Sequence, residues 1–123
     1  MTIDQAIVRL DALKYNTYSR VEKRFWLSQL DSRVRREVLD THENPPETPF
    51  TGYDDKTPGD MELLIPAPYD ELYLNHLGAM VDFHNGEIEK YNNAATLFHA
   101  GWEAFTHWYN RTHLPLGSQW RYR

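Results

Sequence analysis

A chain of 123 residues without cysteine has the length of one domain, and the missing thiols exclude disulfides and thiolate metal sites. Its net charge is −5, and residues 42–62 alone account for this value, because they hold six acids against Lys56. The remainder of the chain is therefore neutral overall. An acidic segment on a neutral body argues against nucleic acid as the main partner. The charged, periodic start and the lack of a membrane-length apolar run predict a soluble domain that stays in the cytoplasm.

Two amphipathic helices are predicted before the acidic segment. The first runs from about Thr2, its cap, to Lys14, with one apolar stripe formed by Ile3, Ala6, Ile7, Leu10 and Leu13. The second begins at Ser19, which forms a capping box with Glu22, and ends near Thr41. Its predicted buried side consists of Phe25, Trp26, Leu30, Val34 and Val38. Basic residues are expected on the rest of its surface: Arg20, Lys23, Arg24, Arg33, Arg35 and Arg36.

A long irregular segment follows over residues 42–67. Six of the seven prolines lie between Pro45 and Pro68, and a loop of this length in a compact domain is usually functional or disordered. We expect residues 62–65 to be extended, and a short strand is the alternative there. The apolar side chains expected to hold the loop on the body are Phe50, Tyr53, Met61, Leu63, Leu64 and Ile65.

Two further helices are predicted, and the short link Asn85-Gly86 between them indicates an antiparallel hairpin. The third begins at Pro68, with an apolar stripe of Tyr69, Leu72, Tyr73, His76, Leu77, Met80, Val81 and His84. The fourth runs from about Glu87 to Asn110, with a stripe of Ile88, Tyr91, Ala95, Phe98, Trp102, Phe105 and Tyr109. Flanking small and apolar residues make this surface wider than one packed neighbour needs.

Catalytic and metal sites are not expected. His99, Glu103 and His107 share a face of the fourth helix, but a bundle metal site would also need Glu-x-x-His motifs on partner helices. The acids around Asp54 lack the spacing of a calcium-binding EF-hand loop. No nucleophile motif or phosphate-binding glycine loop is present, so we predict a protein that is not an enzyme and uses no cofactor.

The C-terminal tail, residues 114–123, is broken by proline and ends in Trp120, Arg121, Tyr122 and Arg123. Two interpretations stay open. Such a tail is typical of a frayed terminus, and it is equally typical of an arm that becomes ordered on a partner, because Trp, Tyr and Arg dominate interface energetics. The domain organisation is thus a helical body over residues 1–113, carrying the acidic loop 42–67, and an arm over 114–123.

Several runs resemble one family of small tailed-bacteriophage virion proteins. They are the run from Leu64 to Tyr73, Asn85-Gly86-Glu87 with Lys90 to Asn93, the run from Trp108 to His113, and the opening from Ile3 to Tyr18. The family is that of head–tail connector proteins, also called adaptor or head-completion proteins. No single motif is diagnostic, because none encodes chemistry. The resemblance is specific because several runs match in the same order along the chain. The resemblance covers most of the chain up to His113.

The resemblance implies a structural virion protein: a helical subunit of a ring between the portal and the tail or a stopper protein. Its partners would be further copies of itself, the portal and the tail or stopper protein, with DNA only passing through the channel. It would reside in the virion neck, and in the host cytoplasm during assembly. A generic helical interaction module, such as a small chaperone or regulator, is the alternative. The candidate interface residues are Trp120, Arg121, Tyr122, Arg123, Trp102, Trp108, Phe50, Tyr53, Asp54, Asp55, Arg33 and Arg36.

Overall fold

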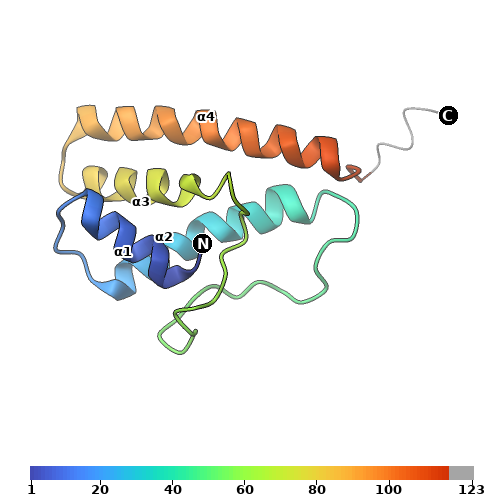
Figure 1. The fold of residues 1–123 in the computed structure, drawn as a ribbon, viewed down its shortest axis with the longest axis horizontal. Helices are drawn as coiled ribbons and strands as arrows, with labels where there is room; N and C mark the ends of the chain where they lie inside the picture. The colour runs from blue at the N-terminus through green and yellow to red at the C-terminus, as the bar shows by residue number, and fades with distance from the viewer. Residues whose placement is uncertain (117–123) are drawn as a thin grey trace.

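The computed structural model describes residues 1–116, and within them the chain is a small helical bundle, as the sequence predicts. The helices are α1 (Ile3–Leu13), α2 (Arg20–Val34), α3 (Glu71–His84) and α4 (Ile88–Thr112), and α2 continues into a π-helical turn, η1 (Arg35–Leu39). Figure 1 shows α3 in the middle of the molecule, with α4 on one side and α1 and α2 on the other. No helix in the described part is long and apolar enough to span a membrane.

The first helix begins where the sequence predicts. The Thr2 hydroxyl accepts a hydrogen bond from the Gln5 amide, and the Gln5 side chain accepts one from the Thr2 amide, which completes a capping box. The apolar stripe is buried as far as Leu10, but Leu13 is 70% exposed and its predicted burial is wrong. The last turn instead meets α3 through a charged side chain, because the Lys14 ammonium lies 2.6 Å from an oxygen of Asp82.

The buried side of α2 is predicted correctly except at Phe25, which is 55% exposed. The side chains of Trp26, Leu27 and Leu30 fill the contact with the core, and Phe25 lies outside it. Ser19 caps the helix by accepting a hydrogen bond from the Glu22 amide.

Two of the cations expected on the outside of α2, Lys23 and Arg24, are buried. Each has oxygen partners that compensate for the loss of water. The Lys23 ammonium lies 2.8 Å from an Asp11 oxygen, and the Arg24 guanidinium donates to the carbonyls of Asp54 and Thr57 at 2.6 and 2.9 Å. The expectation that these two cations decorate the surface is therefore wrong.

The long segment between η1 and α3 is irregular, as predicted, but much of it is bonded to the body. The returning chain pairs with the start of α1, since the Ile3 amide donates to the Met61 carbonyl and the Leu63 amide to the Met1 carbonyl. One isolated bridge, between Thr2 and Glu62, stands where a short strand was considered. Hydrogen bonds within the chain thus hold this part of the loop against the helical body.

The hairpin of α3 and α4 forms as predicted, with Gly86 at a φ of +75° in the connection, a backbone conformation that favours glycine. The third helix begins at Glu71, later than predicted, because the chain just before it forms turns with short-range hydrogen bonds. Both helices carry the expected apolar repeat, but they differ greatly in burial. Only Phe105 is buried on α4, whereas α3 buries Leu72, Tyr73, Leu74, Leu77, Gly78, Ala79, Val81 and Asp82.

Candidate interaction surfaces

The outer helix α4 is the longest helix, and the rest of the body covers it on one side only. Its 25 residues pack on α3 along one side, and Phe105 alone is fully inside. Leu97 is 61% exposed and Ile88 is 59% exposed, while Trp102 and Trp108 are half-buried. The aromatic side chains of α4 thus pack partly against the core, while its uncovered side is mostly polar and exposes two large apolar side chains, Ile88 and Leu97.

Arg33 joins the end of α2 to this outer helix. Its guanidinium lies 4.2 Å from the centre of the Trp102 ring and 5.9 Å from that of Phe98, within the range of a cation–π interaction. The same guanidinium bonds Glu37 at 2.5 Å. Two of the predicted interface residues, Arg33 and Trp102, are therefore in contact with each other.

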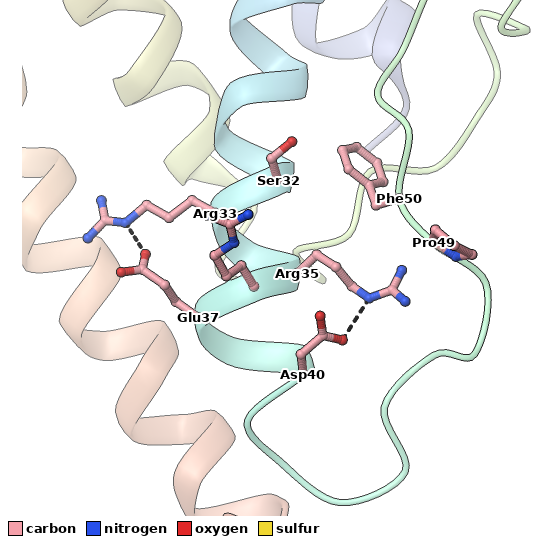
Figure 2. A pocket seen from close by; sticks show the side chains of 8 residues that line it. Ser32, Arg33, Arg35, Glu37, Asp40, Pro49 and Phe50 are labelled. Atoms are coloured by element: carbon pink, nitrogen blue, oxygen red, sulfur yellow. Dashed lines mark hydrogen bonds and ion pairs between the residues drawn. The ribbon is translucent and has the colours of Figure 1, made fainter.

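A groove of about 730 Å³ runs over the π-helical turn beside this corner. Its lining residues are Ser32, Arg33, Arg35, Arg36, Glu37, Asp40, Pro49 and Phe50. Figure 2 shows Arg33 and Glu37 on the side towards α4, while Pro49 and Phe50 close the opposite side from the loop. We call this feature the arginine groove. π-Helical turns are rare and often lie at functional sites, which makes it a candidate for binding.

The three arginines of the groove differ in their partners. Arg33 bonds Glu37, and Arg35 bonds both the Asp40 carboxylate at 2.9 Å and the Pro46 carbonyl at 2.7 Å. The exposed Arg36 guanidinium makes no ion pair or hydrogen bond with any of residues 1–116. With three cations and two acids, the groove has a net charge of +1 in a chain whose net charge is −5.

Residues 54–60 form the second charged feature, which we call the acidic tip. Within it, the Asp54 carboxylate accepts hydrogen bonds from the amides of Lys56 and Thr57 at 2.8 and 3.0 Å. These bonds, that of Lys56 above all, lower the pKa of Asp54. Asp55 and Asp60 are exposed. The tip is therefore a preformed turn that directs free carboxylates outward.

A buried carboxylate holds the loop close to the tip in place. Asp31, on α2, is fully buried and accepts hydrogen bonds from the hydroxyls of Tyr53 and Tyr73 at 2.5 and 2.6 Å and from the Leu64 amide at 3.2 Å. Burial raises the pKa of the Asp31 carboxyl, although all three donors favour its charged form. Burial beside the Asp31 carboxylate also raises the pKa of both tyrosines. One side chain thus ties α2, the loop and α3 together.

Within residues 1–116 the predicted interface residues lie at four places. Phe50, Arg33 and Arg36 line the arginine groove, and Asp54 and Asp55 lie in the acidic tip. Tyr53 does not belong to either surface, because its hydroxyl donates a hydrogen bond to the buried Asp31 carboxylate. The two tryptophans lie on α4, where Trp108 packs against Tyr69 at a ring distance of 5.2 Å. Sequence reasoning missed Arg24, Asp31 and Tyr73 as the residues that hold the loop, because their partners lie far away along the chain.

The first residues of the tail pair with the start of the loop. The Glu43 amide donates to the Leu114 carbonyl, the Leu116 amide donates to the Thr41 carbonyl, and a bridge joins His42 to Pro115. The proposed arm begins from this anchored position. Its four predicted contact residues lie outside the described part of the chain: Trp120, Arg121, Tyr122 and Arg123.

The face of α4 that was considered for a metal carries His99, Glu103 and His107, all of which are exposed. Over residues 1–116 no group of three or more histidine or acidic side chains is placed to hold a metal ion. The chain matches no protein-family model, no curated protein and no solved structure.

Proposed function

We propose that this chain is a head–tail connector subunit of a tailed bacteriophage, a structural protein that forms a ring between the portal and the tail. Its partners are then neighbouring copies, the portal protein and a tail or stopper protein. Its place is the virion neck. DNA only passes through the channel of the ring.

The observation that carries the proposal is the resemblance of the run from Leu64 to Tyr73 and the run from Trp108 to His113 to that virion family. The first run crosses from the loop into α3, and the second closes α4. Both lie where the loop and the hairpin meet the body, so the resemblance falls on residues that organise this fold.

The distribution of surfaces supports the same proposal. A ring interface is heterologous, so a subunit needs two different patches that complement each other. The exposed side of α4, the arginine groove and the acidic tip are distinct surfaces on one subunit. Hydrogen bonds of Asp31 and Arg24 hold the loop before assembly, so little ordering entropy is lost when a neighbour binds.

The test is a phage in which the gene for this chain is inactivated. We expect DNA-filled heads and free tails to accumulate separately, and purified protein added to the lysate to restore joined particles. Capture of the portal protein by the tagged chain should accompany the restored joining. Normal virions from the inactivated phage, or capture of host proteins alone, would overturn the proposal.

A further inference from the structure

The acidic tip and the arginine groove are oppositely charged. The tip, residues 54–60, carries three aspartates against Lys56 and so has a charge of −2, while the groove has three arginines against two acids. Among the exposed charges, Asp55 and Asp60 on the tip and Arg36 in the groove make no side-chain hydrogen bond or ion pair with any of residues 1–116. Each surface therefore offers charged groups that the described subunit leaves available to a partner.

The two surfaces cannot meet within one subunit. Arg24 holds the carbonyls of Asp54 and Thr57, so the tip is tied to the first half of α2. Arg36 lies 12 positions further along the same helical rod. At about 1.5 Å per residue this is ~18 Å along the axis, beyond the reach of a direct ion pair. The rigid separation prevents self-neutralisation and leaves both surfaces for another copy.

We propose that the acidic tip of one copy binds in the arginine groove of the next, with Asp55 and Asp60 bonding Arg36. This inference rests on the proposed function, because it names the contact between neighbouring subunits. The contact joins two different surfaces, so it repeats head to tail and closes into a ring if the rotation allows. Pro49 and Phe50 wall the groove on one side and limit how a tip can enter it.

The absence of cysteine makes the contact directly testable. Ser32→Cys places a thiol in the groove and Lys56→Cys places one in the tip, and neither removes a proposed ion-pair partner. With a short bismaleimide, the concentrated double variant should give a ladder of covalent oligomers in low salt. Each single variant should stop at the dimer. A double variant that also stops at the dimer would overturn the proposal.

Charge reversal separates this contact from general association. In the double-cysteine background, Arg36→Glu should reduce species larger than the dimer roughly tenfold, and Asp55→Arg with Asp60→Arg should restore them. Arg9→Glu makes the same change of charge on α1, outside the groove, and should leave the ladder intact. A ladder that is indifferent to Arg36→Glu would contradict the ion pairing.

The outcome for the interface can be separated from the outcome for the proposed function. A chain that captures the portal and restores joined particles, yet gives no ladder, retains the connector function and refutes the tip-in-groove contact. A ladder without portal capture retains the contact and refutes the connector function. Raising the salt from about 50 mM to about 500 mM should weaken the ladder, because exposed ion pairs are screened.

Discussion

The two helices of the hairpin, α3 and α4, carry similar apolar repeats but have different environments. On α3, eight of 14 residues are buried, whereas on α4 only one of 25 is. Figure 1 shows the reason: α3 lies between α4 and the pair α1 and α2, while α4 has the body on one side only. An apolar repeat therefore indicates which side of a helix turns inward, and the number of packed neighbours decides how deeply.

The strongest test of this comparison uses two phenylalanines whose burial is the opposite of what is usual for their helices. Phe105 is 1% exposed on the outer helix, and Phe83 is 53% exposed on the central one. We expect Phe105→Ala to lower the free energy of unfolding by ~3–5 kcal/mol, because it leaves a cavity. Phe83→Ala should cost less than about 1 kcal/mol in the same urea titration. Equal losses would show that the burial of the individual side chain does not set the cost.

A pair of leucines tests whether residues on α3 are in general more buried than those on α4. Leu77 on α3 is completely buried, and Leu97 on α4 is 61% exposed. Leu77→Ala should lower the free energy of unfolding by ~2–5 kcal/mol. Leu97→Ala should change it by no more than about 0.5 kcal/mol in the isolated subunit. A large loss at Leu97 in dilute monomer would mean that α4 is covered within the chain.

The link from α2 to α3 through Asp31 should make stability depend on pH. Burial raises the pKa of this carboxyl in the folded state, so the folded chain binds its proton more tightly than the unfolded chain does. The contribution is fully present below the ordinary pKa of about 4 and is lost as pH rises through the folded value. Asp31→Asn should cost ~1–3 kcal/mol at pH about 4.

The cost of Asp31→Asn should shrink at higher pH, because the amide has no charge to bury. Urea titrations of both chains between about pH 4 and pH 8 measure this difference. Asp40→Asn, at an exposed carboxylate, is the matched control and should show a much weaker dependence. A gap between the natural chain and Asp31→Asn that widens with pH would contradict the assignment.

The smallest expected effect concerns the tie between α2 and the outer helix. Arg33→Gln removes the guanidinium that lies over Trp102, and we expect a loss of ~0.5–1 kcal/mol in the free energy of unfolding. Arg9→Gln is the control, because within residues 1–116 Arg9 forms only a surface ion pair with Glu71. If the two variants lose the same stability, the contact with Trp102 contributes nothing beyond an ordinary surface pair.

Much of the fold could be predicted because its signals are local. The cap at Thr2, the cap at Ser19 and the positive φ of Gly86 lie at three boundaries and depend on neighbours a few residues away. The capping box predicted for Ser19 and Glu22 forms in one direction, and a complete box stands instead at Thr2 and Gln5. The interface candidates were predictable only as types of residue. Arg36 and Phe50 were both candidates, but that they line one groove follows from the path of the loop past η1.

The order of helices, their caps and the hairpin turn are encoded within short stretches, since each depends on hydrogen bonds and periodicity over one or two helical turns. The degree to which each side chain is buried, and the partner that each charged group finds, are not encoded in this way. Leu13 and Phe25 are exposed, and Arg24 and Asp31 are buried, because of elements that lie far away along the chain. The reason is physical: burial and the pairing of charges depend on every element that packs around a site, and only the folded chain brings those elements together.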